Sequence, residues 1–306
     1  LIFLSILIFF FFHKDDDKKS YGFFWFSKET SILINNWFMM YFLSVVLIGT
    51  IYPIFLEVLS SQKISVGPPF YHKLIIPFLI PFLIAMAVGP KLKWIKSNIE
   101  DKIYLILLFA ISIVLSFLIV KKFNSNLLIN TILISSALYL FFITLRDFFI
   151  KKYGNVSQNI AHFGFSLLIL SILFNNLFSS EIITNLKVGE TFTSPNTKIV
   201  FKSINKKEEK NYISIRANFR IENLNGIIDD LSPELRIYNQ PNIATSEADI
   251  KTSLLSDKFI VVNAVQNKDY FNVRYQVKSF MLWIWLSVIL ISLAGFISFF
   301  KKEYEK

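Results

Sequence analysis

The segment NIAHFGFSLLILSILFNNLF, residues 159–178, combines a long apolar run with a single histidine, His162. Its 20 residues are enough for a helix to cross the roughly 30 Å hydrocarbon core of a membrane. An ionisable side chain at membrane depth costs several kcal/mol unless it has a partner, so His162 is a candidate functional residue. The same segment leads directly into the only long polar stretch of the chain, residues 179–279. The sequence therefore predicts a membrane helix followed by a polar domain.

The composition is that of a membrane protein. The chain has 306 residues, of which 54% are hydrophobic and 34 are Phe, and its mean hydropathy is +0.51. Only 18% of its residues are charged, against about 25% in soluble domains. Its net charge of +10 comes from Lys and Arg in short loops beside apolar segments, which is typical of orientation signals and argues against nucleic-acid binding. The absence of cysteine excludes disulfides and thiolate metal sites within this sequence.

Seven apolar segments predict membrane helices, at residues 1–12, 33–56, 74–90, 103–120, 127–145, 159–178 and 280–299. The first begins with Leu1 instead of Met and is too short to span, so we expect it to be the truncated end of a helix. The predicted fold class is a membrane all-α polytopic bundle of about seven helices, with an all-β domain inserted before the last helix. The expected divisions are membrane helices at 1–178, the β domain at 179–279, the final helix at 280–299 and a tail at 300–306.

The positive charges predict the orientation of the chain in the membrane. If the segments alternate, one side carries three loops and the tail, which together hold 14 Lys and Arg, at 13–32, 91–102, 146–158 and 300–306. The two short loops on the other side, 57–73 and 121–126, hold 4. The positive-inside rule makes the first side cytoplasmic and the β domain extracytoplasmic, which is periplasmic in a bacterium. His162 then lies near the cytoplasmic end of its helix.

The polar stretch predicts β structure. The runs YISIRANFRI (212–221) and FNVRYQV (271–277) alternate apolar and polar residues, as half-buried strands do. The runs TKIVFKSI (197–204) and DKFIVVNAV (257–265) are also typical of strands. Together they predict a small antiparallel sandwich or barrel, and about 100 residues suffice for a core of its own.

Few residues carry recognisable chemistry. His162 shares a helix face with Ser166, four residues further on. Three roles are open for this histidine: a hydrogen bond to a neighbouring helix, axial ligation of a heme or metal, and proton transfer. His72 and His13 lie in predicted loops, where a histidine is most often solvated. The sequence contains no phosphate loop, zinc-ligand spacing or Ser-His-Asp order.

Eight motifs follow one another along the chain: FSKETSILINNW (26–37), GTIYPIFLEVLSSQKISVGPPFYHKLIIP (49–77), VGPKLKW (88–94), NIAHFGFS (159–166), LKVGETF (186–192), LSPELRIYNQP (231–241), SEADI (246–250) and VRYQVKSFMLWIW (273–285). In this order they closely resemble the C-terminal half of the CcmF family, the membrane subunit of the heme lyase of cytochrome c maturation. The resemblance extends from about Phe24 to Ser298.

The resemblance implies a multi-pass inner-membrane protein, in the bacterial plasma membrane or the mitochondrial inner membrane. With a CcmH-like thiol-handling subunit, such a protein takes heme from the carrier CcmE and attaches it to the CxxCH motif of apocytochrome c outside the membrane. The family also holds a heme b inside the membrane between two histidines. His162, in the AHFG motif, matches the second of these ligands, and the first is expected outside this chain.

Supporting roles are expected for Ser166, Lys28 and Glu29. Lys28 stands where the family usually has Arg, so it keeps the charge but loses the planar fork that could hold a propionate at two points. The β domain is expected to dock partners, with Pro233, Glu234 and Arg236 forming a shaped turn and Arg274 a candidate anion contact. Fold support is the alternative role for all four.

The tryptophan-rich WWD segment of the family, which handles the substrate heme, is absent from this sequence. We therefore expect that the chain alone is not catalytically sufficient as a heme lyase. Two other functions stay open: a non-catalytic scaffold or assembly subunit of the same complex, and a secondary transporter. A transporter predicts inverted internal repeats, which the sequence does not contain.

Overall fold

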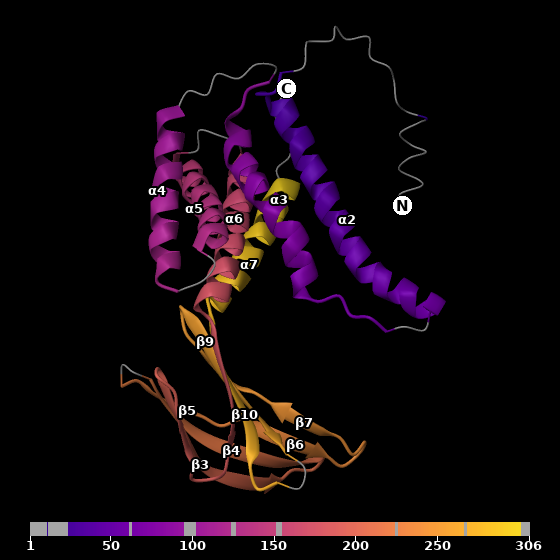
Figure 1. The fold of residues 1–306 in the computed structure, drawn as a ribbon, viewed down its shortest axis with the longest axis vertical. Helices are drawn as coiled ribbons and strands as arrows, with labels where there is room; N and C mark the ends of the chain where they lie inside the picture. Colours follow the sequence, from indigo (N-terminus) through magenta and orange to yellow (C-terminus); the bar gives the residue numbers. More distant parts are fainter. Residues whose placement is uncertain are drawn as a thin grey trace. The chain divides into compact units, whose positions relative to one another are not determined.

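A computed structural model of the chain describes Phe11 and residues 24–60, 63–94, 102–123, 127–150, 155–223, 226–265 and 268–300. Within these ranges, 6 helices are long and apolar enough to cross a membrane (Figure 1). They are α2 (Lys28–Ser60), α3 (Pro68–Val88), α4 (Lys102–Lys121), α5 (Leu127–Ile150), α6 (Val156–Phe178) and α7 (Met281–Phe300). The first predicted segment, apart from Phe11, and His13 lie outside the described residues, as does the tail after Phe300.

The chain forms two compact units, and the first, Leu1–Ile103, contains α2, α3 and the short 3-10 helix η1 (Gly89–Lys91). Aromatic rings fill the space between α2 and α3, where the Phe38 and Phe82 rings meet edge to face with centroids 5.6 Å apart. Gly49 lets the helices approach, because a Cβ there would lie 2.6 Å from the hydroxyl oxygen of Tyr71.

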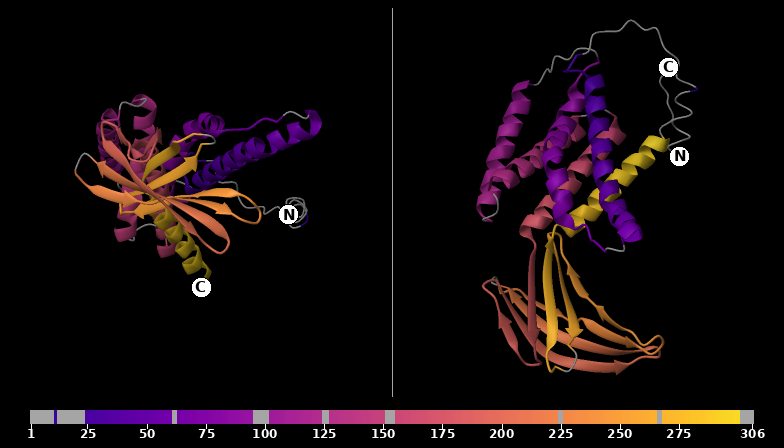
Figure 2. Two further views of the ribbon diagram at one scale, coloured as in Figure 1. Left: turned by 90° about the horizontal axis from the view of Figure 1, so that it is seen from below. Right: turned by 45° about the vertical axis from the view of Figure 1, so that its right-hand side comes forward.

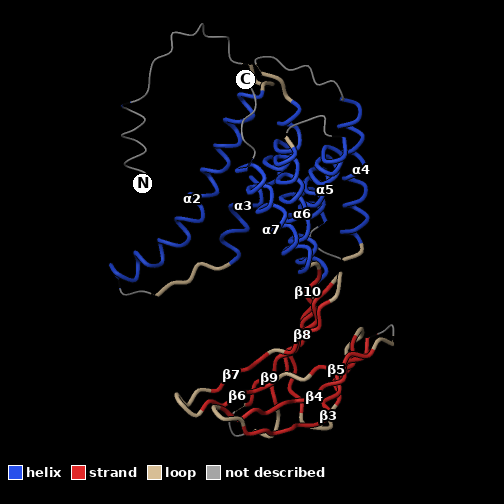
Figure 3. The backbone as a smooth tube through the Cα atoms, turned by 180° about the vertical axis from the view of Figure 1, so that it is seen from behind, coloured by secondary structure: helices blue, strands red, loops and turns tan. Residues whose placement is uncertain are grey.

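The second unit, Tyr104–Lys306, contains α5, α6, α7, nearly all of α4 and every described strand. Its helices and strands form separate parts (Figure 3). Among the six helices, α5 is the most buried, and its buried residues include Ser135, Ser136 and Thr144 beside apolar side chains. Ser116 of α4 donates a hydrogen bond to the carbonyl oxygen of Thr131 on α5 at 3.0 Å, which is a typical link between membrane helices.

The strands form two antiparallel sheets. The first has the order β1-β10-β9-β8, with β1 (Ser180–Leu186), β8 (Asp249–Thr252), β9 (Ser256–Ala264) and β10 (Phe271–Ser279). The second has the order β2-β3-β4-β6-β7, and β5 also pairs with β4. Its strands are β2 (Thr191–Thr193), β3 (Thr197–Glu208), β4 (Tyr212–Asn223), β5 (Ile228–Leu231), β6 (Glu234–Tyr238) and β7 (Ala244–Glu247). The predicted β domain inserted before the last helix is confirmed, and the four predicted runs correspond to β3, β4, β9 and β10.

The core of this sandwich lies between the inward faces of the two sheets. The Phe201 and Phe219 rings stack at its centre with centroids 4.4 Å apart, and Ile260 and Val273 complete it from the other sheet. Each such side chain contributes about 1.5–3 kcal/mol when fully buried. The alternation in β4 weakens at Ser214, which is buried although it has the parity of the outward residues. Its cross-strand neighbours are a Lys and an Arg, whose long side chains flank the small serine.

Two short connections join the sandwich to the helices, and we call them the neck: residues 178–180, from α6 to β1, and 279–281, from β10 to α7. They run side by side (Figures 1 and 2). The side chain of Asn175 donates a hydrogen bond to the carbonyl oxygen of Ser279 at 2.6 Å, and the amide of Ser279 donates to the hydroxyl of Ser179 at 3.1 Å. The end of α6 and the beginning of α7, about 100 residues apart in the chain, are thus held together by hydrogen bonds.

Candidate functional site

His162 lies on α6, six residues after the helix begins at Val156, which corresponds to about 9 Å along the axis. Its side chain is half-buried. It makes no hydrogen bond to any of the described residues, so neither ring nitrogen is engaged by the protein there. The role of a histidine hydrogen-bonded to a neighbouring helix, left open by the sequence, therefore finds no support in the described part of the chain. An imidazole with unengaged nitrogens in an apolar helix is suited to ligation.

Two neighbouring helices fix the position of α6. On one side, the hydroxyl groups of Ser166 and Thr144 of α5 share a hydrogen bond of 2.9 Å. On the other side, Gly164 packs against α7, where a Cβ would lie 2.9 Å from Cγ1 of Ile291 and 3.2 Å from the carbonyl oxygen of Ser287. Gly164 thus serves close helix packing, and Ser166 holds α6 against α5 without a hydrogen bond to His162.

An acidic group lies near His162 that the sequence reasoning missed. The sequence predicts the end of the fifth helix at residue 145, but α5 continues to Ile150 and includes Arg146 and Asp147. The Asp147 side chain is buried and acts electrostatically on His162. Arg146 points elsewhere, with its guanidinium 3.9 Å from the centroid of the Tyr104 ring. The apolar residues 148–150, which follow the charged pair, were the available signal that the helix goes on.

Lys28 and Glu29 begin α2 in the first unit. The Lys28 ammonium lies 5.3 Å from the centroid of the Trp94 ring, and its backbone amide donates to the carbonyl oxygen of Lys93 at 3.0 Å. Glu29 is exposed in the first turn, where a carboxylate complements the helix dipole. Both residues therefore have local structural roles in this unit.

Arg274 points outward from β10, as its position in the alternation predicts, and its side chain is half exposed. Its guanidinium forms an ion pair with Glu181 on β1, and Gln276 donates to the same carboxylate at 2.7 Å. The hydrogen bond from Arg274, and to a smaller extent the one from Gln276, holds the pKa of Glu181 below its usual range. The geometry gives Arg274 an internal partner and so favours the fold-support role.

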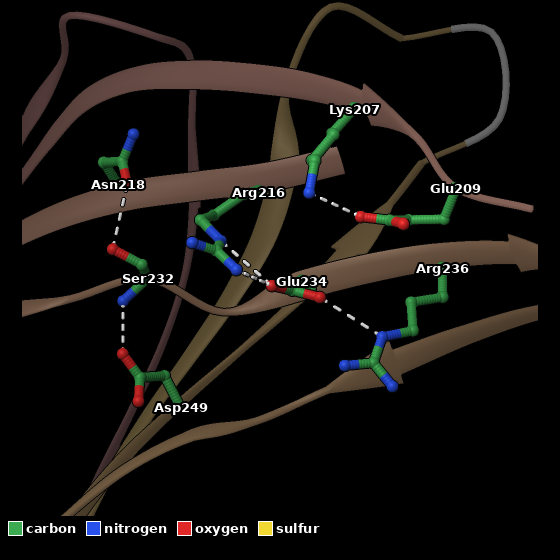
Figure 4. Close-up of polar contacts among 8 residues, drawn as sticks. All are labelled: Lys207, Glu209, Arg216, Asn218, Ser232, Glu234, Arg236 and Asp249. Atoms are coloured by element: carbon green, nitrogen blue, oxygen red, sulfur yellow. Dashed lines mark hydrogen bonds and ion pairs between the residues drawn. The ribbon is translucent and has the colours of Figure 1, made fainter. Parts of the chain in front are cut away.

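A charged hollow of about 320 Å³ opens on the sandwich around Glu234 (Figure 4). Glu234 accepts hydrogen bonds from Arg216 and from Arg236, the latter at 3.2 Å. The bond from Arg216 is the main cause that holds the pKa of Glu234 below its usual range, while burial opposes it. Next to it, the amide of Ser232 donates to Asp249 at 2.6 Å. Glu234 and Arg236 lie on strand β6 and not in the turn that the sequence predicts, because both pair with residues of β4. Since the two arginines share one carboxylate, the hollow is poorly suited to holding an anion.

A second ionic cluster lies inside the sandwich and joins its two sheets. Asp229 of β5 is 2% exposed, and its two carboxylate oxygens accept hydrogen bonds at 2.6 Å from Lys251 of β8 and Lys258 of β9. Burial by itself would raise the pKa of Asp229, but the two lysines outweigh it and hold this pKa below its usual range. Close by, the Tyr275 hydroxyl is buried without a hydrogen bond from any described residue, and burial, followed by the charge of Asp229, raises its pKa to about 12.

The residues present fit a heme ligand better than a metal-ion site. In the described ranges, no three His, Cys, Asp or Glu side chains come together as ligands of an ion. A heme needs only one axial side chain from each side of its plane, and His162 offers an unengaged imidazole. On the same helix, Phe163 packs on Phe141 and Phe148 of α5 with centroids 5.6 and 6.0 Å apart.

Comparison with known proteins agrees with this architecture. The family model described as the CcmF C-terminal beta-sandwich matches residues 177–279. The chain is 26% identical over 296 residues to the cytochrome c-type biogenesis protein CcmF of Pseudomonas fluorescens, a match that covers 91% of this chain and 44% of the relative. It is 24% identical over 289 residues to CcmF of Escherichia coli K12, covering 92% and 45%.

A solved structure has the same fold. The structure described as cytochrome c heme lyase CcmF superposes with a TM-score of 0.69 at 19% sequence identity, covering 89% of this chain and 46% of that one. The chain thus spans less than half the length of the relatives that it matches.

The helices, the inserted sandwich and these matches define a multi-pass membrane protein that is similar over most of its length to proteins of cytochrome c-type biogenesis. More narrowly, residues 177–279 belong to the CcmF C-terminal beta-sandwich family, and over 91% of its length the chain is homologous to CcmF. The family resemblance drawn from the eight motifs is confirmed.

Proposed function

We propose that this chain forms the C-terminal part of a membrane heme lyase of cytochrome c maturation and that His162 is one axial ligand of a heme b. The second axial ligand comes from outside this chain. The observation that carries the proposal is the half-buried imidazole of His162, which lies in a membrane-length helix and has no hydrogen bond to any described residue. A polar group without a partner is costly inside a membrane. Coordination of a heme iron by the His162 nitrogen would remove this cost.

The surrounding residues have distinct tasks in this proposal. His162 would hold the heme iron through one ring nitrogen, and the buried carboxylate of Asp147 would accept the proton of the other ring nitrogen and so orient the ring. Ser166, through Thr144, keeps α6 at a fixed rotation against α5. A heme b supplies a one-electron couple in the membrane, which would keep the iron of the substrate heme ferrous while its vinyl groups react with thiols.

The proposed partners follow from the same assignment. A CcmH-like thiol-handling subunit, the heme carrier CcmE and apocytochrome c would meet the protein on the side of the sandwich, which is extracytoplasmic by the distribution of Lys and Arg. The two ends of α6 are then the sandwich end and the cytoplasmic end, and His162 is about 24 Å from the former. This distance argues against direct contact between a heme held by His162 and the thioether chemistry.

The test is a visible spectrum of the full-length protein, purified in detergent, for the wild type, His162→Ala and the control His72→Ala. His72 is an exposed histidine at the start of α3, so its loss should leave any membrane heme in place. We expect split α and β bands of a bis-histidine heme b in the wild type and in His72→Ala, and their loss in His162→Ala. An unchanged heme spectrum in His162→Ala would return this residue to a packing role. A wild type without heme would favour the scaffold function.

A further inference from the structure

The turn between β8 and β9, around residues 253–256, carries two exposed leucine side chains. Leu254 is 72% exposed and Leu255 is 63% exposed, side by side at the tip of the hairpin. Polar residues on both sides close the turn without using these side chains. The amide of Ser253 donates to the carbonyl oxygen of Ser256 at 3.0 Å, and the amide of Ser256 donates to the Ser253 hydroxyl at 3.2 Å. The tip is therefore an ordered structure with an apolar end.

The same turn is hydrogen-bonded to the beginning of the last membrane helix. The indole nitrogen of Trp283, in the first turn of α7, donates to the carbonyl oxygen of Leu254 at 2.9 Å. The amide of Phe280 donates to the carbonyl oxygen of Leu255 at 2.8 Å. Phe280 holds this position with a φ of 61°, which is uncommon and costly for a residue other than glycine. The tip of a soluble-looking domain is thus held at the level where α7 begins.

The backbone of the tip suits an environment with little water. The carbonyl oxygens of Leu254, Leu255 and Ser256 all accept hydrogen bonds, so these three polar groups meet the requirement that backbone groups face when they leave water. Trp283 is of the residue type that marks the boundary between lipid and water, where its ring lies among the headgroups. Leucines beside it, at the same level, would meet the acyl boundary and not bulk water.

We propose that the β8–β9 turn is a membrane-contact element, in which Leu254 and Leu255 insert into the outer part of the bilayer beside α7. The partner is the lipid itself, because the turn is hydrogen-bonded to the beginning of α7, a helix of membrane-spanning length. The sandwich then has three attachments at the bilayer: the two connections of the neck and the inserted turn. This places limits on how the sandwich can tilt when it meets other proteins.

The experiment uses single cysteines, because residues 1–306 contain none. Leu254→Cys and Leu255→Cys are each labelled with an environment-sensitive NBD fluorophore in the full-length protein, reconstituted in phosphatidylcholine vesicles. The vesicles are prepared with and without lipid that carries a nitroxide quencher just below the headgroup. The matched control is Val188→Cys, an apolar residue that is 49% exposed in the turn after β1. It lies at the other end of the sandwich, about 20 Å or more from the neck.

We expect nitroxide lipid to reduce the emission several-fold at both leucine positions and to leave the control at Val188 unchanged. The emission at the leucine positions should also be shifted to the blue relative to the control. Equal quenching at all three positions, or none at either leucine, would overturn the proposal. Because each label replaces an exposed side chain, an unchanged size-exclusion profile is expected for each variant. The two leucine positions also test the proposal independently of each other.

Discussion

Replacing Asp229 with Asn should loosen the sandwich at the point where its two sheets are joined by charge. The Asp229 carboxylate is 2% exposed and accepts hydrogen bonds from two ammonium groups, Lys251 and Lys258. In Asp229→Asn the amide keeps one oxygen acceptor but turns a donor towards a lysine. The variant thus leaves buried positive charge without its counter-charge, which is the costly way to disrupt a buried ion pair.

The expected magnitude follows from how far each lysine can escape into water. Removing one partner of a fully buried pair costs about 3–5 kcal/mol. The Lys251 side chain is 56% exposed and can turn into solvent, whereas the Lys258 side chain is 18% exposed and remains largely trapped. With one of the two lysines released, we expect about 2–3 kcal/mol for Asp229→Asn. That corresponds to an increase of about 30- to 150-fold in the opening of the strands involved.

The assay is hydrogen exchange with mass spectrometry on the full-length protein, which reports local opening without requiring the sandwich to be isolated. Amides of β5, β8 and β9, the strands that carry Asp229 and the two lysines, should exchange faster in Asp229→Asn by the factor above. The control is Asp230→Asn on the same strand, because Asp230 is exposed and its pairs with Lys202 and Arg220 lie at the surface. Exposed pairs contribute little, so this variant should exchange like the wild type. Equal effects of the two substitutions would refute the argument from burial.

Three further outcomes follow from the same contacts. The pKa of Asp229 is lowered by folding, so its contribution to stability is complete above the unfolded pKa of about 3.9 and is lost as the pH falls through the folded value. The difference in protection factors between wild type and Asp229→Asn should therefore shrink below about pH 4, and a constant difference would contradict this. Tyr275→Phe should stabilise the sandwich by about 1 kcal/mol, seen as slower exchange in β10, because it removes a buried hydroxyl without a partner among the described residues; destabilisation would mean that the hydroxyl is bonded. Gly164→Val should force α6 and α7 apart at a cost of about 1–3 kcal/mol. It should therefore weaken disulfide cross-linking between cysteines placed at Ser157 and Ala294, which are in contact across the two helices. The control Gly295→Val should leave the cross-linking unchanged, because a Cβ there meets nothing within 4 Å.

The sequence was sufficient for those features that depend on local periodicity. Apolar runs located α2 to α7, and the alternation in YISIRANFRI and FNVRYQV located β4 and β10, because both patterns follow from which face of one element is buried. The end of α5 was missed, since a charged pair interrupts the apolar run before the helix ends. The sequence also did not predict contacts between residues that are far apart in the chain. Nothing near Asp229 in the sequence indicates Lys251 or Lys258, which arrive on two other strands.

The candidate site shows the same division. His162 and its helix were evident from one segment, because a histidine in a membrane-length apolar run is rare. Its surroundings were not evident: Thr144 as the partner of Ser166, Asp147 as the nearby acid and Ile291 as the neighbour of Gly164 all come from other helices. Which side chains meet depends on the rotation of each helix about its axis, and this is set by packing between helices.

The neck has a thermodynamic consequence for the helices that it joins. In the folded sandwich, Ser180 and Val277 are cross-strand partners, so the whole domain acts between α6 and α7 as a short turn would. When the sandwich unfolds, the same two helix ends are linked by a flexible loop of about 100 residues, some five doublings longer, which adds about 3 kcal/mol to the entropy cost of keeping them paired. The helix pair is therefore most stable when the sandwich is folded, and by reciprocity a paired α6 and α7 favour folding of the sandwich. A substitution that destabilises the sandwich therefore also destabilises the α6–α7 pair, and the reverse, even where no contact between the two parts changes.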